Sequence, residues 1–411
     1  MEKVVLVIPK DSVAADPLAY PSLGILYIAA VLDRDDFQVS IYDMREKKNI
    51  IEMIPNVDVY CFTAVTSQIR QVIYDSRYIR NVIKKFTVIG GHYASYCAEQ
   101  IKNDFDAIVI GEGESVIVDI IKNRKIGIFN GLSFSKRQDI DKIPFPARYL
   151  LPKEKIVNNS ISNGYGYEGN PGTTIITTRG CPRKCAFCSN TPQRVRYRDP
   201  YLVVEEIKYL IKEYSCKSFK ILDDNFLLKL SHVKSICEGI KHLGIEFRCA
   251  ARSDDITDEK CKILKEAGCK ELAIGVEVAD DKILKTMNKK ETVADHKKAI
   301  KIIKDNDILV RLYLMVGLPG ETQESIEKTK QFIKETNPDK FTISCFMPYA
   351  GCPIWNNPEK YGVEIERENY ENYFQLYPVI DPPYRTKECN KEDIKKQHKD
   401  LLDFAKEYKN E

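Results

Sequence analysis

Short apolar runs and longer helical patterns alternate over most of this 411-residue chain. Between residues 173 and 346 the alternation repeats six times, and each run is rich in β-branched residues. The predicted strands are Thr173–Thr177, Phe219–Leu222, Glu246–Ala250, Glu271–Gly275, Val310–Val316 and Lys340–Cys345. Successive βα units favour a parallel sheet covered by helices, so we expect a six-unit partial barrel. By analogy with full barrels, its chemistry should lie at the carboxyl ends of the strands.

A second array of strands and helices precedes this one. Helical patterns at Leu23–Leu32 and Gln68–Lys85 separate several of its apolar runs. The predicted strands are Val4–Ile8, Gln38–Tyr42, Val57–Phe62, Phe86–Ile89 and Ala107–Ile110. This pattern predicts a doubly wound, Rossmann-like α/β domain. Ligands of such domains bind at the carboxyl ends of the strands, and these ends include Pro9–Tyr20 and Thr63–Ser67.

The composition along the chain suggests four segments. Residues 1–135 form the first domain, 136–172 a connector, 173–346 the partial barrel and 347–411 a helical tail. The connector ends in a stretch rich in glycine, asparagine and serine, Asn158–Gly172, which is typical of a linker. The tail is first aromatic and then lysine-rich, and its aromatic side chains could pack or could cap the barrel mouth: Tyr361, Tyr370, Tyr373, Phe374, Tyr377 and Tyr384.

Charge and hydropathy exclude several classes of partner. Lys+Arg number 63 against 60 Asp+Glu, and no basic stripe is visible, so we expect no nucleic-acid partner. The longest apolar run, Ile25–Leu32, is too short to span a bilayer, and the N-terminus does not have the pattern of a signal peptide. The sequence therefore predicts a cytoplasmic protein without a membrane partner.

Thirteen cysteines are many for a reducing compartment, where metal binding or catalysis explains them better than disulfides do. Ten are scattered singly and are expected to be small buried apolar residues: Cys61, Cys97, Cys216, Cys237, Cys249, Cys261, Cys269, Cys345, Cys352 and Cys389. The other three, Cys181, Cys185 and Cys188, form one short loop after the first barrel strand.

This loop has the spacing of an iron–sulfur site. Three thiolates on a 4Fe–4S cluster leave one iron free for an external ligand. A structural zinc site would normally use a fourth cysteine or histidine nearby. Arg183 and Lys184 lie within the loop, and we expect their charges to lower the pKa values of the thiols.

With Phe187 before the last cysteine, the loop resembles the signature of the radical S-adenosylmethionine (SAM) superfamily. The resemblance implies that the open iron binds the amino and carboxylate groups of SAM. One electron then cleaves SAM to methionine and a 5′-deoxyadenosyl radical, which takes a hydrogen atom from the substrate. It also implies a reduced electron donor such as flavodoxin or ferredoxin.

The resemblance extends to other strand ends, although each position could also be a plain turn or salt bridge. It implies that Asp223, Asp224 and Asn225 contact the SAM amino group. Arg252 would pair with the carboxylate, and Glu277 would bind the ribose hydroxyls. Gly317 and Leu318 would belong to a turn, Gly317–Thr322, that faces the adenine.

The N-terminal array resembles the cobalamin-binding domain that precedes many radical SAM cores, and Ile143–Arg148 matches the connector of such proteins. Glycine turns would let backbone N–H groups approach the corrin and its phosphate tail, although Gly111–Gly113 could be only a turn and cap. The implied contacts are Leu23, Gly24, Thr63, Thr66, Gly90, Gly91, His92, Gly111, Glu112 and Gly113. The loop after the first strand has no DxHxxG histidine, so the axial ligand of cobalt stays open.

These features favour a cobalamin-dependent radical SAM enzyme that methylates an unactivated carbon of a small molecule. A second reading keeps both cofactors but ends in a cyclisation, ring contraction or other rearrangement. A methylthiotransferase is disfavoured because the first domain holds only Cys61 and Cys97, too few for a second cluster. A metal-binding regulator would need a partner-binding module, and none is visible. The sequence does not identify the substrate.

Overall fold

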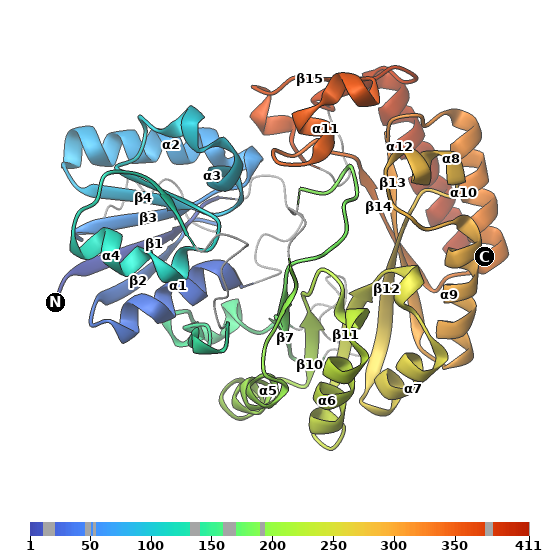
Figure 1. Cartoon of the computed structure of the whole chain (residues 1–411), viewed down its shortest axis with the longest axis horizontal. Coiled ribbons are helices and arrows are strands. Elements are labelled where there is room, and N and C mark those ends of the chain that lie inside the picture. Colours follow the sequence, from blue (N-terminus) through green and yellow to red (C-terminus); the bar gives the residue numbers. More distant parts are fainter. Residues whose placement is uncertain are drawn as a thin grey trace. The chain divides into compact units, whose positions relative to one another are not determined.

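The computed structural model describes residues 1–10, 21–45, 51, 55–131, 140–158, 170–189, 194–374 and 381–410. Most of the Pro9–Tyr20 loop, most of the Asn158–Gly172 linker and Tyr377 lie outside these ranges. The chain divides into two compact units, Met1–Asn158 and Asn159–Glu411 (Figure 1). None of the described helices has the length and apolar character needed to cross a membrane.

The first unit is built on a fully parallel sheet, which confirms the doubly wound domain. The strand order is β2-β1-β3-β4-β5-β6. The strands are β1 (Lys3–Ile8), β2 (Gln38–Asp43), β3 (Val59–Thr63), β4 (Phe86–Gly90), β5 (Ala107–Ile110) and β6 (Gly127–Asn130). The order reverses between β1 and β3, which places the expected ligand crevice at the loops that follow these strands. The edge strand β6 was not predicted from the sequence.

Helices cover both faces of this sheet. The helices α1 (Leu23–Arg34) and α4 (Ile117–Lys122) contribute Ile25, Ala29 and Ile120 to a core shared with the strands. In Figure 1, α2 (Ile69–Tyr78) and α3 (His92–Cys97) lie on the opposite face. The helix predicted over Gln68–Lys85 is less regular than expected. It continues from α2 into a wider π-helical turn and ends at Lys84, whose φ is 60°.

Part of the predicted connector belongs to the first unit. The backbone N–H of Ala147 donates to the carbonyl of Leu26 at 3.0 Å, and the Arg148 side chain is fully buried. Lys155 forms an ion pair with Asp43 at 3.1 Å. The first unit therefore extends to Asn158, whereas the sequence suggested that the first domain ends at residue 135.

The second unit contains the predicted curved six-stranded sheet, and every strand is parallel to its neighbours. Its order is β14-β13-β12-β11-β10-β7, so each strand lies beside the one before it in the sequence. The strands are β7 (Gly172–Ile175), β10 (Ser218–Ile221), β11 (Glu246–Ala251), β12 (Cys269–Glu277), β13 (Leu309–Val316) and β14 (Lys340–Cys345). This arrangement confirms the partial barrel.

The barrel helices follow the predicted pattern. They are α5 (Pro200–Tyr214), α6 (Leu230–Ile240), α7 (Asp258–Glu266), α9 (Val293–Asp305) and α10 (Gln323–Thr336). Two further elements appear inside the βα units, the short helix α8 (Asp281–Thr286) and a ribbon of β8 (Thr178–Arg179) with β9 (Arg196–Tyr197). In the sequence, β8 precedes the cysteine loop and β9 follows it, and α8 directly precedes the turn that holds this loop.

The tail is more structured than the predicted helical segment. It holds a short helix, α11 (Pro353–Asn356), and an antiparallel pair, β15 (Val363–Ile365) and β16 (Tyr384–Thr386), before the long helix α12 (Lys391–Asn410). The helix α12 packs on β13, β14 and α10. Tyr373 and Tyr384 are buried, so these two aromatic side chains pack within the second unit.

Candidate active site

The cysteines fall into two groups that differ in exposure. All ten single cysteines are buried, which confirms their expected role as small apolar residues. Cys181, Cys185 and Cys188 are partly exposed and lie on the loop after β8. Only these three thiols are therefore reachable by a cofactor in the described part of the chain.

Hydrogen bonds from two distant segments hold the loop. The Ala186 N–H donates to the carbonyl of Met287 at 2.8 Å, and Asn288 Nδ2 donates to the carbonyl of Lys184 at 2.7 Å. The N–H of Ile354, in α11, donates to the carbonyl of Ala186 at 3.2 Å. The turn after α8 and the C-terminal tail thus fix the position of the thiols.

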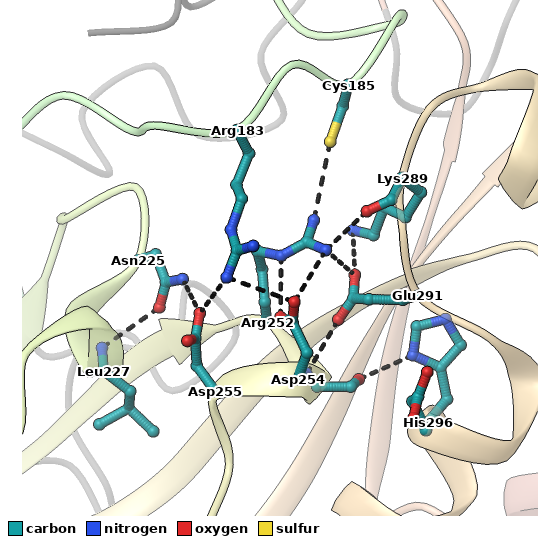
Figure 2. Close-up of polar contacts among 12 residues, drawn as sticks. Arg183, Cys185, Asn225, Leu227, Arg252, Asp254, Asp255, Lys289, Glu291 and His296 are labelled. Carbon is teal, nitrogen blue, oxygen red and sulfur yellow. Dashed lines mark hydrogen bonds and ion pairs between the residues drawn. The ribbon is translucent and has the colours of Figure 1, made fainter. Parts of the chain in front are cut away.

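Arg252 lies beside the cysteine loop, as Figure 2 shows. Its side chain is buried, and Nη1 lies 3.7 Å from the sulfur of Cys185. The other nitrogens donate to Asp254 at 2.9 Å, to the carbonyl of Lys289 at 2.6 Å and to Glu291 at 3.1 Å. Arg252 is therefore fixed with one edge of its guanidinium directed at the cluster loop.

Lys289 is a second buried cation at this site. Its Nζ lies 2.8 Å from Glu277 and 3.5 Å from Glu291, and 5.8 Å from the centre of the Phe187 ring. Burial acts to lower the pKa of Lys289, but the two carboxylates outweigh it and raise that pKa. Lys289 therefore stays charged below the loop and joins Glu277 to Phe187.

The backbone of β12 is shaped around the Glu277–Lys289 pair. Glu277 has φ of 65°, a left-handed conformation that a side chain other than glycine rarely adopts. The strand register shifts between Gly275 and Glu277. A Cβ at Gly275 would lie 2.5 Å from the Glu277 carboxylate and 3.0 Å from Lys289 Nζ. Gly275 thus leaves the space in which the ion pair forms, and a strained residue at a strand end is typical of functional sites.

The expected lowering of the thiol pKa values by Arg183 and Lys184 is wrong for Cys181 and Cys185. Burial raises the pKa of both thiols and outweighs the neighbouring cations. The cations that oppose burial at Cys185 are Lys289 and Arg252. Arg183 opposes burial at Cys181 through its backbone N–H and its charge, and its guanidinium pairs with Asp254 and Asp255, at 3.3 and 3.4 Å.

The residues after β10 lie in three different environments. The carboxylate of Asp223 is buried and accepts hydrogen bonds from the Thr177 hydroxyl and from the Thr177 and Thr178 N–H groups. Burial raises the pKa of Asp223 to about 6. Asn225 is buried and donates to Asp255 at 2.6 Å, whereas Asp224 is exposed. Asp223 thus ties together the ends of β7 and β10, and Asp224 keeps an accessible carboxylate.

The turn after β13 is held from both sides. Gly317 has φ of 87°, and its N–H donates to the buried carboxyl of Glu321. The Tyr384 hydroxyl, from β16, donates to the Gly317 carbonyl at 3.2 Å and fills the space where a Cβ would lie. Burial raises the pKa of Glu321 to about 8. Leu318 is buried in the same turn. The tail therefore supports the turn that was expected to face adenine.

The donor set fits an iron–sulfur cluster with SAM. Among the described residues, no three His, Cys, Asp or Glu side chains converge closely enough for a single metal ion. A 4Fe–4S cluster places its thiolates on separate irons, so its ligands need not converge on one point. Two buried cations, Arg252 and Lys289, lie beside the loop and can compensate thiolate and carboxylate charge.

In the first unit, the loops after β3 and β4 present buried polar atoms. Within the described residues, the Thr66 hydroxyl and His92 Nε2 are buried and lack a hydrogen-bond partner. Burial lowers the pKa of His92, which keeps the imidazole neutral at pH 7. The N–H of Tyr93 donates to the carbonyl of Ala64 at 3.0 Å, which joins the two loops. Buried polar atoms without a partner at the carboxyl ends of these strands fit a polar ligand such as cobalamin.

The predicted cobalamin-contacting glycines of the first unit differ in why their positions require or tolerate glycine. Gly91 has φ of 87°, and a Cβ there would clash with the Thr63 hydroxyl. Gly113 begins a short helical turn and packs against Ile28 of α1, which supports the turn-and-cap alternative for this glycine. Leu23 is buried at the start of α1, and among the described residues no atom lies within 4 Å of a Cβ built at Gly24. Gly90 and Glu112 are half-buried beside these turns.

Sequence reasoning missed Lys289 and Glu291. The segment Met287–Glu291 reads as a charged surface turn, and only the folded chain buries two of its charges. The sequence does contain a signal for them. Lys289 and Glu291 lie in the short connection between the helices α8 and α9. The capping box of Thr292 and Asp295 begins α9 directly after this segment.

Comparison with known proteins finds a match for each of the two domains. The model of the radical SAM superfamily matches residues 175–333, and the B12 binding domain matches residues 10–121. An uncharacterised methyltransferase of Pyrococcus horikoshii is 28% identical over 96% of this chain and 90% of its own. An anaerobic magnesium-protoporphyrin IX monomethyl ester cyclase of Rubrivivax gelatinosus is 26% identical over 88% of this chain and 70% of its own.

A solved structure shares the fold of the chain. It is the radical S-adenosylmethionine methyltransferase TsrM from Kitasatospora setae, with cobalamin and a [4Fe-4S] cluster bound. The TM-score is 0.70 at 14% identity, and the match covers 99% of this chain and 89% of the other.

Proposed function

We propose that this chain, whose residues 175–333 match the radical SAM superfamily and whose residues 10–121 match the B12 binding domain, methylates an unactivated carbon of a small, non-protein substrate. The observation that carries the proposal is the joining of the two domains in one chain whose P. horikoshii relative, alike over nearly its whole length, is named a methyltransferase. A radical SAM domain alone can abstract a hydrogen atom from a substrate. The B12 domain adds a cofactor that can carry a methyl group to the resulting carbon radical.

Cys181, Cys185 and Cys188 would hold the 4Fe–4S cluster and leave one iron for SAM. The cluster and SAM together supply one-electron cleavage of SAM and a hydrogen-abstracting radical. Arg252 directs its guanidinium edge at this site and would bind the SAM carboxylate. Asp224, which is exposed after β10, is the more accessible of the two aspartates for the amino group.

Glu277, Gly317 and Leu318 would line the nucleoside part of SAM. Glu277 is fixed by Lys289, so one carboxylate oxygen is held while the other can accept a ribose hydroxyl. The Gly317 turn is held by Glu321 and Tyr384. Phe187, with Lys289 behind its ring, would cover the cofactor from the loop side.

For cobalamin, the first unit offers the loops after β3, β4 and β5. Thr63, Thr66 and His92 would contact the corrin or its tail, because their polar groups lie at the strand ends. Gly90 and Gly91 would allow close backbone approach, as would Gly111, Glu112 and Leu23–Gly24. His92 is neutral, so its imidazole can donate or accept a hydrogen bond there.

Reductive chemistry needs an external electron source, and we propose a flavodoxin or a ferredoxin for this role. The compartment would be the cytoplasm, since partly exposed thiols such as Cys181 and Cys185 stay reduced there.

The test uses anaerobic holoenzyme, loaded with cluster and cobalamin, and SAM that carries a labelled methyl group. Candidate small molecules are supplied, and products are followed by mass spectrometry. We expect transfer of the label, a mass gain of one CH₂, and loss of activity in Cys185→Ala. Full methylation by enzyme prepared without cobalamin would contradict the proposal.

One observation favours a second candidate function, a cyclisation or other rearrangement without methyl transfer. The R. gelatinosus relative is named a cyclase and is 26% identical to this chain. The same experiment separates the two, since a rearranged product carries no label and gains no CH₂.

A further inference from the structure

One short segment, Met287–Glu291, contacts three separate parts of the candidate site. Its first two residues hold the cysteine loop by hydrogen bonds. The Lys289 carbonyl accepts a hydrogen bond from Arg252 at 2.6 Å, and the Lys289 ammonium donates to Glu277 at 2.8 Å. Arg252 follows β11, and Glu277 ends the neighbouring strand β12. The segment therefore connects the cysteine loop to the ends of two barrel strands.

Four charged side chains form a continuous row of ion pairs here. Nη2 of Arg252 lies 3.1 Å from Oε2 of Glu291, and the same oxygen lies 3.5 Å from Nζ of Lys289. Nζ of Lys289 lies 2.8 Å from Oε1 of Glu277. Figure 2 shows the first two of these links. We name Arg252, Glu291, Lys289 and Glu277 the ion-pair row, in which positive and negative charges alternate.

The ion-pair row is removed from water along its whole length. The exposed fraction of its four side chains lies between 0% for Glu291 and 11% for Glu277. In a low-dielectric interior, a change of charge at one group acts on its neighbours more strongly than it would in water. A ligand charge at one end of the row therefore acts on the other end through the two groups between them.

In the proposed function, the two ends of the row bind opposite ends of SAM. A carboxylate on Arg252 would compensate part of the positive charge that Glu291 compensates in its absence. Glu291 would then compensate Lys289 more fully, and Lys289 would attract Glu277 less strongly. The Glu277 carboxylate would accept a ribose hydroxyl more readily as a result. The sign of this effect is favourable at every step, because each pair in the row is of opposite charge.

We propose that Glu291 and Lys289 are positioning residues that couple the two halves of the SAM site. Binding of a carboxylate at Arg252 then strengthens binding of a ribose at Glu277. This inference rests on the proposed function and adds to it two residues that act through Arg252 and Glu277. By thermodynamic linkage, binding of the ribose strengthens binding of the carboxylate by the same factor.

The coupling has a consequence for the two fragments that SAM cleavage and hydrogen abstraction leave, methionine and 5′-deoxyadenosine. While methionine occupies the Arg252 end, the nucleoside is held more tightly at the Glu277 end. Once methionine leaves, 5′-deoxyadenosine dissociates more easily. The row thus favours release of both fragments together.

The test uses holoenzyme loaded with cluster and cobalamin and kept without reductant, so that no SAM is cleaved. Methionine is the probe of the Arg252 end, and 5′-deoxyadenosine is the probe of the Glu277 end. Titration calorimetry measures the dissociation constant of each probe without the other and with a saturating concentration of it. We expect each probe to tighten binding of the other at least about fivefold, and by the same factor in both directions.

Glu291→Gln interrupts the row at its centre and leaves each cation a second acid. Arg252 keeps Asp254 at 2.9 Å, and Lys289 keeps Glu277 at 2.8 Å. The amide oxygen of the new side chain can still accept from the Asp254 N–H, as Glu291 Oε1 does at 3.1 Å. We expect the variant to fold and its tightening factor to fall below about twofold. A merely structural role would weaken binding of each probe alone and leave the factor between them unchanged.

Asp43→Asn is the matched control. Asp43 is a buried carboxylate of the first unit that, like Glu291, pairs with one arginine and one lysine. Arg45 lies 2.8 Å and Lys155 3.1 Å from its Oδ2. The control variant should keep the full tightening factor even where its melting temperature falls, because Asp43 does not belong to the ion-pair row.

Two results would overturn the inference. One is independent binding of methionine and 5′-deoxyadenosine in the unchanged protein. The other is the same tightening factor in Glu291→Gln as in the unchanged protein. If Glu291→Gln does not fold, Glu291→Asp decides instead. That variant keeps the charge but shortens its reach by one CH₂, and an undiminished factor in it would contradict the inference.

The outcome for the proposed function is read separately. The titrations need no turnover, so a failure of methyl transfer leaves the tightening factor measurable. A protein that binds SAM and both probes without coupling contradicts only the inference. A protein that binds neither SAM nor the probes contradicts the SAM site and the inference together.

Discussion

At the scale of residues, the site depends on how buried charges are paired. Arg252, Lys289, Glu277 and Glu291 lie together below a loop of thiols, and each is almost inaccessible to solvent. Buried ion pairs contribute little net stability, but removal of one partner leaves the other buried and uncompensated. These four charged side chains therefore fix one another's positions more than they stabilise the fold.

Lys289→Gln should destabilise the second unit strongly. Two buried carboxylates would lose their shared cation, which costs about 3–5 kcal/mol in free energy of unfolding. Urea unfolding followed by circular dichroism measures the change. Lys290→Gln is the matched control, because Lys290 is exposed and next in sequence. Similar losses in both variants would show that Lys289 is not held as described.

The residues predicted from sequence illustrate what local patterns can and cannot reveal. The three clustered cysteines were separable from the ten single ones by spacing alone. The burial of Lys289 could not be predicted from the sequence. A charged turn becomes buried only through long-range packing, here against β12 and the cysteine loop. Asp223 was assigned to SAM by its position at a strand end, yet its carboxylate accepts hydrogen bonds from two threonines that follow β7, Thr177 and Thr178.

At the scale of elements, apolar runs with β-branched residues predicted all six barrel strands. The bounds of β14 agree with the prediction, and the others differ by a few residues. The strands β6, β15 and β16 were missed because they are short and partly exposed, so they show no clear apolar period. Tertiary contacts, rather than local sequence, make these segments extended.

The antiparallel pair of β15 and β16 has a consequence for cofactor binding. Tyr384→Phe removes the hydroxyl that donates to Gly317 but keeps the ring packed on Phe346. A net hydrogen bond is worth about 0.5–1.5 kcal/mol, so we expect SAM affinity to fall by up to about tenfold. Equilibrium binding of SAM to cluster-loaded protein measures this.

Tyr361→Phe provides the control, since Tyr361 is partly exposed in the same tail. If both tyrosine variants bind SAM as tightly as the unchanged protein, the tail does not support the Gly317 turn in the way proposed.

At the scale of the whole molecule, stability should depend on pH through Glu321. Its pKa is raised from 4.5 to about 8 by burial, so the folded chain holds a proton there that the unfolded chain releases above pH 4.5. The unfolded state binds fewer protons between these values, and stability therefore falls as pH rises from about 4.5 to 8. In Glu321→Gln, the fall in the free energy of unfolding between pH 4.5 and 8 should be smaller by a few kcal/mol. Unfolding curves between pH 5 and 9 measure the effect, and an unchanged slope in the variant would contradict it.

The strand order of the barrel also affects how the chain can be assembled during synthesis. Each strand of the barrel sheet after β7 pairs with the barrel strand made before it. A nascent chain that leaves the ribosome can thus extend this sheet at one growing edge, without reopening pairs already formed. The first sheet differs, since β3 must pair with β1 on the side away from β2. Its assembly therefore needs pairing on both sides of β1 rather than at one growing edge.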